Sequence, residues 1–300
     1  MASGTEVKRS QLEHRLRLFD AGVAALSRTA PGAPPDCYLC PLCLRYLTRA
    51  SVAARALTME HVPPAAVGGT RMLLTCVDCN NASGVQYDSH MAPAEAYRTF
   101  GTPESTGPIE ATVTLDGVSN RGLVKFDGRT LEHVGIEKRN DPRVLAQFGE
   151  LLPTLGKGAD VEVSFTGPSP ESFKRAAIGW LRSAYLATFS LLGYRYTLRS
   201  ELDVVREAIA TGRTDLVPVV TRPEWTRQRI AIVPSAPDWL AGSVVVIQDA
   251  TLTFLPSGRR DCDVLARLIA LKTAAVGQIA GFDYEVVLGW PKHPEYRADQ

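Results

Sequence analysis

The sequence has almost no net charge and few low-complexity runs. Its 33 Lys and Arg residues against 32 Asp and Glu residues give a formal net charge of +1. Nonspecific affinity for nucleic acid comes largely from cations that displace counterions from phosphates, so this balance argues against a uniformly basic binding protein. Any nucleic-acid function would need a local basic surface. With 45% hydrophobic and 22% charged residues, the composition is that of an ordinary globular chain.

Long apolar segments are also missing. The longest apolar run, around residues 184–194, is too short and too interrupted to cross a bilayer. The N-terminus "MASGTEVKRSQLEH" lacks the apolar core of a signal peptide. We therefore expect a cytoplasmic protein with no membrane association.

Cysteines are few but unevenly placed, because five of the six lie between Cys37 and Cys79 at two-residue gaps. In a reducing cytoplasm, paired C-x-x-C turns usually indicate a metal site. The second turn is Cys76 with Cys79, whereas the first is either Cys37 with Cys40 or Cys40 with Cys43. We favour Cys40 and Cys43, because "CPLC" before an apolar, arginine-bearing stretch is typical of a knuckle that closes into a hairpin. These four thiolates predict a closed structural zinc site.

Composition and periodicity divide the chain into three regions. Helical spacing of apolar residues and the linker "TAPGAPPD" define residues 1–35, and a cysteine-rich module follows at residues 36–100. Residues 101–300 predict an α+β domain with antiparallel strands. Strands are expected in "IEATVTLDG", "GLVKFDG", "LEHVGIE", "DVEVSFTG", "RQRIAIVP", "SVVVIQD", "TLTFLPSG" and "DYEVVLGW", and helices in "DPRVLAQFGELL", "SPESFKRAAIGWLRSAYLATFSLLGY" and Asp263–Ile279.

An acid and a histidine stand side by side between the two cysteine turns. The order is C-x-x-C, sixteen residues, Glu60-His61, fourteen residues, and C-x-x-C with Asn80 directly after it. This ordered combination resembles the HNH, or ββα-metal, endonucleases, in particular those whose finger is pinned by four cysteines. The resemblance covers residues 40 to about 91.

The resemblance implies a β-hairpin followed by a helix, which together hold one divalent cation such as Mg²⁺ or Mn²⁺. His61 would be the general base that takes a proton from the attacking water. Glu60, which stands where the family commonly has Asp, and Asn80 would bind the cation. For the family's middle Asn, which orients the base, the sequence offers only Arg71 or Thr75.

The chemistry of these side chains is compatible with phosphodiester hydrolysis. A histidine with a pKa near neutrality can act as a base, and carboxylate and amide oxygens suit magnesium. His90 is a weaker candidate for a further ligand of the catalytic cation, and Asp88 is weaker still. A solvated or helix-terminal role is the simpler interpretation of His90.

These observations predict a metal-dependent HNH endonuclease that acts on nucleic acid, with DNA as the expected substrate. The alternative is a non-catalytic zinc finger that binds nucleic acid or protein. Residues 101–300 are expected to select the substrate or to mediate association with another copy or a protein partner. Lys174, Arg175 and Arg182 could form a nucleic-acid surface, but such charges more often belong to the solvated face of an amphipathic helix.

Overall fold

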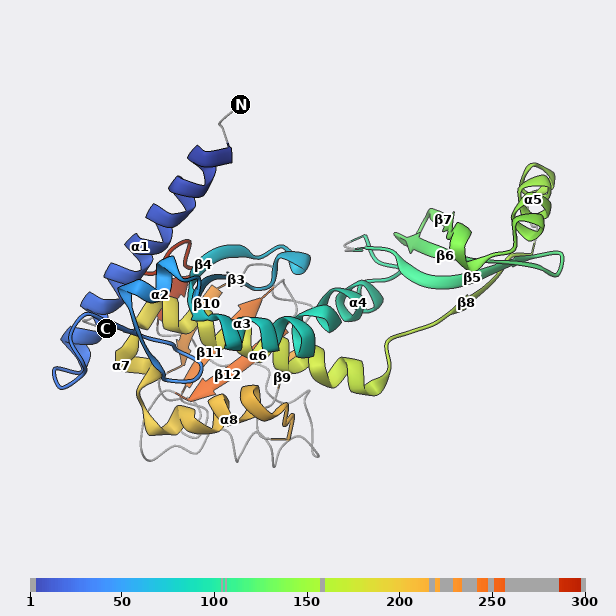
Figure 1. The fold of residues 1–300 in the computed structure, drawn as a ribbon. Coiled ribbons are helices and arrows are strands. Elements are labelled where there is room, and N and C mark those ends of the chain that lie inside the picture. Colours follow the sequence, from blue (N-terminus) through green and yellow to red (C-terminus); the bar gives the residue numbers. More distant parts are fainter. Residues whose placement is uncertain are drawn as a thin grey trace. The chain divides into compact units, whose positions relative to one another are not determined.

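A computed structural model describes residues 4–103, 105, 107–156, 160–215, 219–221, 229–233, 242–247, 251–256 and 286–297 (Figure 1). The α-helices are α1 (Gly4–Thr29), α2 (Arg49–Ala53), α3 (Val77–Ser83), α4 (Ser89–Arg98), α5 (Pro142–Leu151), α6 (Pro170–Leu192), α7 (Tyr194–Thr197) and α8 (Asp203–Thr211). The strands are β1 (Cys37–Leu39), β2 (Tyr46–Thr48), β3 (Leu57–Val62), β4 (Thr70–Cys76), β5 (Ile109–Leu115), β6 (Val118–Phe126), β7 (Leu131–Gly135), β8 (Glu162–Phe165), β9 (Val219–Thr221), β10 (Arg229–Val233), β11 (Gly242–Ile247), β12 (Thr251–Pro256) and β13 (Val286–Gly289). None of these described helices combines the length and the apolar character that a bilayer span requires.

The chain forms two compact units, and their limits differ from the boundaries predicted at residues 35 and 100. Unit 1 comprises residues 1–89 and 174–300, and unit 2 comprises residues 90–173. Most of the cysteine-rich module, up to residue 89, thus shares a unit with residues 174–300. The reason is contacts of long sequence separation, such as the hydrogen bond that the Tyr194 Oη donates to the Leu39 carbonyl at 2.6 Å.

The core of unit 1 begins where α1 packs on the cysteine-rich module. Leu18 and Phe19 of α1 share a buried cluster with Tyr38 of β1 and with residues of both hairpin strands β3 and β4. The Tyr38 Oη donates to the Leu74 carbonyl at 2.7 Å, which ties β1 to β4. The predicted N-terminal helix is therefore confirmed, and its apolar face covers the module.

Helix α6 is buried on every side along its second half. Every residue from Ile178 to Leu191 is buried, as expected for a helix that is apolar around its whole circumference. Two tyrosines attach its C-terminal end and the following turn to the cysteine region: Tyr185 Oη donates to the Pro41 carbonyl at 2.8 Å, and Tyr194 bonds Leu39. Side chains of α6 can therefore reach the interior of the module.

The remaining described strands of unit 1 form an antiparallel sheet in the order β13-β10-β11-β12-β9. Four of these five strands were predicted from alternation, and β9 was not. The predicted helix Asp263–Ile279 lies outside the described residues.

Unit 2 is an antiparallel sheet with a helix on one face. The strand order is β7-β6-β5-β8. Ala111, Val113 and Leu115 alternate along β5 and pack with Phe148 of α5, while the intervening residues form the more exposed face. Helix α5 begins at Asp141, whose carboxylate accepts from the Arg143 N–H at 2.8 Å. Helices and antiparallel strands thus make up both units.

Candidate metal centre and adjoining polar cluster

The two strands β3 and β4 form an antiparallel hairpin that leads directly into α3. The ladder pairs Glu60 with Leu73 but His61 with Arg71, so that Met72 has no partner. Such a bulge breaks the alternation of the strand that carries the extra residue, here β4, whose residues from Met72 to Cys76 are all buried. Glu60 and His61 of β3 are the two residues opposite this irregularity.

The loop of the hairpin depends on two glycines. Gly68 has a positive φ of 81°, which glycine adopts without steric cost. A Cβ built on Gly69 would lie 1.4 Å from the Pro63 carbonyl oxygen, so the two backbone segments approach too closely for any side chain. The two consecutive glycines in the sequence therefore have a steric explanation.

Replacement of Gly69 by alanine is expected to destabilise the hairpin. The clash is with backbone rather than with a flexible side chain, so the loop must shift, and the free energy of unfolding should fall by more than about 1 kcal/mol. Gly84→Ala is the matched control, because a Cβ at Gly84 meets nothing within 4 Å. Urea unfolding of both variants measures the difference, and equal stability of the two would contradict the close approach.

Four cysteines meet where the β1–β2 turn approaches the end of β4 and the start of α3. The sulfurs of Cys40, Cys43, Cys76 and Cys79 all lie within 4.8 Å of one another, and the Cys43 and Cys76 sulfurs are 3.7 Å apart. Tetrahedral zinc with Zn–S bonds of about 2.3 Å separates its sulfurs by about 3.8 Å. The cluster therefore fits a metal ion such as zinc, whereas Cys37 lies outside it.

Backbone and ion-pair contacts hold the two cysteine turns together. The Cys76 N–H donates to the Cys40 sulfur at 3.4 Å, and the Cys79 N–H donates to the Cys76 sulfur at 3.5 Å, which caps α3. Arg45 and Asp78 form an exposed ion pair at 2.6 Å between the two turns. Because N–H groups already point at sulfur, the cluster is arranged for thiolates.

Mutual hydrogen bonding splits the pKa values of the four thiols. A hydrogen bond with Cys40 is the main cause that lowers the pKa of Cys43, to about 6, and it also lowers that of Cys76. The pKa values of Cys40 and Cys79 are raised, mainly by their bonds with Cys43 and Cys40 respectively. Such sharing of protons is expected of thiols placed where a cation would replace those protons.

Glu60 lies in the interior, paired with an arginine of α6. Its side chain is 3% exposed and that of Arg182 is 1% exposed, and the Arg182 Nη2 donates to the Glu60 Oε2 at 2.5 Å. The Thr75 Oγ1 donates to the same oxygen at 3.0 Å. Thr75, one of the two residues available at the position of the middle Asn, thus contacts the carboxylate.

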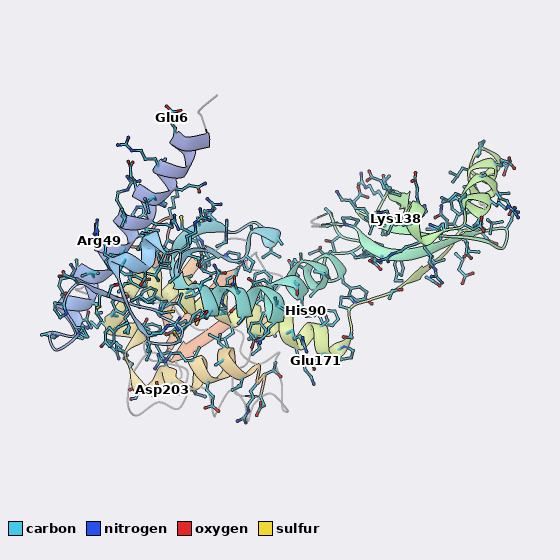
Figure 2. All side chains as sticks on the ribbon, viewed as in Figure 1. Glu6, Arg49, His90, Lys138, Glu171 and Asp203 are labelled. Atoms are coloured by element: carbon cyan, nitrogen blue, oxygen red, sulfur yellow. The ribbon has the colours of Figure 1, made fainter. Side chains whose placement is uncertain are left out.

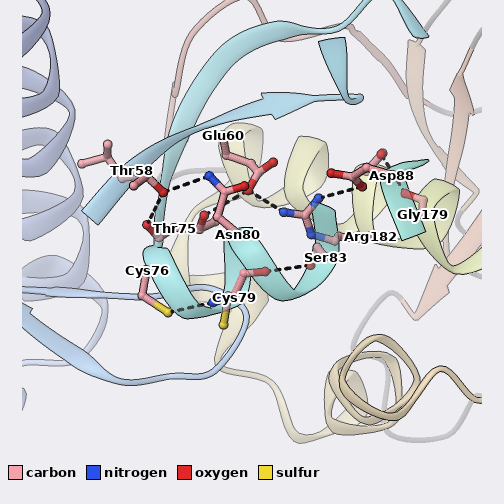
Figure 3. A network of polar contacts seen from close by, with 12 residues as sticks. Thr58, Glu60, Thr75, Cys76, Cys79, Asn80, Ser83, Asp88, Gly179 and Arg182 are labelled. Carbon is pink, nitrogen blue, oxygen red and sulfur yellow. Dashed lines mark hydrogen bonds and ion pairs between the residues drawn. The ribbon is translucent and has the colours of Figure 1, made fainter. Parts of the chain in front are cut away.

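Asn80 joins this cluster from α3. Its Nδ2 donates to the Thr58 Oγ1 at 2.9 Å, and Thr58 faces Thr75 across the hairpin. Figure 3 shows Asn80 and Glu60 in one network with these two threonines. The two residues predicted to bind the catalytic cation are thus linked through Thr58 and Thr75.

Two oxygens of this cluster could bind a hard divalent cation, and a third is already bonded to an arginine. Among the described residues, the Glu60 Oε1 and the Asn80 Oδ1 accept no hydrogen bond, and Mg²⁺ is commonly held by only one or two such oxygens together with water and phosphate. Thr58 and Thr75 fix the two side chains, as partners of metal ligands do. The Glu60 Oε2, in contrast, is occupied by Arg182, so a cation would share the carboxylate with a guanidinium.

His61 follows Glu60 on β3 and is half-buried. Within the part of the chain that the structure describes, its imidazole makes no hydrogen bond. Neither Arg71 nor Thr75 orients the ring, and Thr75 bonds Glu60 instead. Its role as a base stays a prediction.

The two further candidates lie on the helices after the hairpin. A π-helical turn, Gly84–Asp88, links α3 to α4. Asp88 ends that turn, 3.5 Å from the Arg182 Nη1, and burial raises the pKa of its carboxyl to about 6, although Arg182 acts in the opposite direction. His90 of α4 (Figure 2) belongs to unit 2, where its Nδ1 lies 2.9 Å from the Ser172 Oγ. Its assignment as a ligand stays a prediction.

Arg182 is the residue of this cluster that the sequence interpretation missed. It was grouped with Lys174 and Arg175 as a surface cation, and that interpretation is wrong, because the side chain is 1% exposed and bonds Glu60. The signal was the apolar run on both sides of it, "AAIGWLRSAYLATF". A charge inside a helix that is apolar all round must be buried, and a buried charge requires a partner of opposite sign.

Comparisons of the chain with family models, with curated proteins and with solved structures found no match.

Proposed function

We propose that the chain hydrolyses phosphodiester bonds in nucleic acid, with DNA as the substrate, through the β3–β4 hairpin and α3. The observation that carries the proposal is that Glu60 of the hairpin and Asn80 of the helix belong to one hydrogen-bond network, through Thr58 and Thr75, next to the four-cysteine site. In this proposal the cysteines hold a structural zinc ion, which fixes the strand end and the helix start from which these side chains project.

Each residue has a defined role in the proposed reaction. The Glu60 Oε1 and the Asn80 Oδ1 would hold Mg²⁺ or Mn²⁺, and when bound that ion supplies charge stabilisation to the phosphate and the leaving oxygen. His61 accepts the proton of the water whose oxygen attacks phosphorus while the bond from phosphorus to the leaving oxygen breaks. Residues 101–300 would select the substrate or mediate association with another copy or a protein partner.

Cleavage assays test this directly. Purified zinc-loaded protein is incubated with double-stranded, branched and single-stranded DNA and with RNA, in Mg²⁺, in Mn²⁺ and with chelator. We expect metal-dependent cleavage, and a rate about 10²–10⁴-fold lower in His61→Ala, the usual contribution of a general base. His293→Ala is the matched control, because His293 is exposed near the C-terminus. An unchanged rate in His61→Ala would refute the base assignment.

A second function is favoured by the burial of Glu60. Since its carboxylate is 3% exposed and paired with Arg182, the module could instead be a metal-pinned scaffold that binds nucleic acid or protein without cutting. Saturable binding without cleavage in any metal would support this alternative. Glu60→Gln and Asn80→Ala would then leave the affinity for the partner unchanged.

A further inference from the structure

A buried guanidinium lies between two carboxylates in the candidate site. Arg182 bonds the Glu60 Oε2 at 2.5 Å through Nη2, and its Nη1 lies 3.5 Å from the Asp88 Oδ1. Figure 3 shows the guanidinium placed between Glu60 and Asp88. The Arg182 Nε, buried as well, has no hydrogen-bond partner among the described residues. The short hydrogen bond to Glu60 is thus the main polar contact of the guanidinium.

The charges of the three groups do not cancel. Arginine keeps its proton in proteins, so Arg182 offsets one of the two carboxylate charges and the cluster retains one negative charge when both carboxyls are ionised. A guanidinium between two carboxylates also takes the place that a cation bridging them would take. Because like charges repel strongly at short range in a poorly solvated site, Arg182 opposes tight binding of a divalent ion there.

We propose that Arg182 is a positioning residue that acts as the built-in cation of the site. It holds the Glu60 Oε2, leaves the Oε1 to the divalent ion, and keeps Asp88 from binding that ion. The site therefore takes one divalent ion, and takes it weakly. The inference rests on the proposed function for its place in the reaction, but ion binding and unfolding reveal it without any cleavage measurement.

Removal of the arginine charge should convert the two carboxylates into a tighter cation site. In Arg182→Gln, Glu60 and Asp88 lose their shared partner, and we expect the affinity for Mn²⁺ to rise by at least about tenfold over the wild type. Without Mn²⁺ the same variant should unfold about 6–20 °C lower, as expected when a buried pair loses one member. About 1 mM Mn²⁺ should restore most of that loss, because the ion binds only the folded state.

Two further variants separate charge from packing. Arg182→Lys keeps the charge and should retain the weak Mn²⁺ affinity of the wild type, whereas a purely geometric role would make it behave like Arg182→Gln. Arg206→Gln is the matched control, because Arg206 is also buried in unit 1, where it donates to the Thr197 carbonyl and pairs with Asp203. It should lower the unfolding temperature with no recovery in Mn²⁺.

The measurements are Mn²⁺ titration by electron paramagnetic resonance and thermal unfolding of zinc-loaded protein with and without Mn²⁺. If the Arg182→Gln protein folds only when Mn²⁺ is present, this result supports the proposal most strongly, because the ion then replaces the lost charge. The proposal is overturned if that variant binds Mn²⁺ no more tightly than the wild type, or if it fails to fold in Mn²⁺ while Arg206→Gln folds. If no variant cleaves nucleic acid but Arg182→Gln gains Mn²⁺ affinity, the proposed function fails and this inference stands.

Discussion

A Cys76→Ser variant is expected to disrupt the proposed zinc site and to lose most of the stability of unit 1. Cys76 is completely buried, belongs to the core cluster that α1 covers, and its sulfur caps α3. Structural zinc adds an apparent free energy of about 10–16 kcal/mol in small finger peptides, and loss of a metal is among the few changes that cost more than about 4 kcal/mol. We therefore expect less than one equivalent of zinc and unfolding at far lower urea concentration.

Metal content by mass spectrometry and urea unfolding by circular dichroism measure this effect. Cys37→Ser is the matched control, because Cys37 is only half-buried and lies outside the cluster. It should keep a full equivalent of zinc and nearly the wild-type stability. Retention of zinc by Cys76→Ser, or its loss in Cys37→Ser, would contradict the four-cysteine assignment.

Local patterns in the sequence were sufficient to predict most of the described elements. Alternation predicted β5, β6, β7 and β8, because one face of this sheet packs on α5 while the other faces solvent. The C-x-x-C spacing predicted that two cysteine turns would meet, because such a turn presents two sulfurs at a fixed separation. The spacing alone left Cys37 and Cys43 as alternatives, and the stretch after "CPLC" favoured Cys43, which the cluster contains. These features depend on residues close in sequence, which is why the pattern alone identifies them.

The grouping of elements into units could not be predicted in the same way. Tyr194 and Leu39 bond across 155 positions of sequence, and Arg182 and Glu60 across 122. The periodicity of apolar residues within a segment does not indicate which distant segment a buried helix will contact. The burial of Arg182 could be inferred from its apolar neighbours. That its partner is Glu60 rather than another acidic residue could be learned only from the three-dimensional structure.

Replacement of Glu60 by leucine is expected to lower the free energy of unfolding by about 3–5 kcal/mol, the usual cost of removing one member of a buried ion pair. This loss is not the contribution of the ion pair to stability. It is the cost of leaving the buried guanidinium of Arg182 with only Asp88 as a partner, 3.5 Å away. Glu110→Leu is the matched control: its pair with Arg139 is half exposed, so we expect a loss below about 1 kcal/mol.

The double variant Glu60→Leu with Arg182→Met separates the two interpretations of the pair. With both charges gone, no unpaired ion remains at the fully buried position of the pair. Asp88 loses Arg182 as well, but its side chain is 20% exposed and keeps contact with solvent, so stability should return close to the wild-type value. Urea unfolding of the wild type, both single variants and the double variant gives the coupling energy. A double variant as unstable as Glu60→Leu would mean that the pair itself stabilises the fold. Full recovery would mean that the fold does not need these charges, which leaves the chemistry of the site as the reason for their presence.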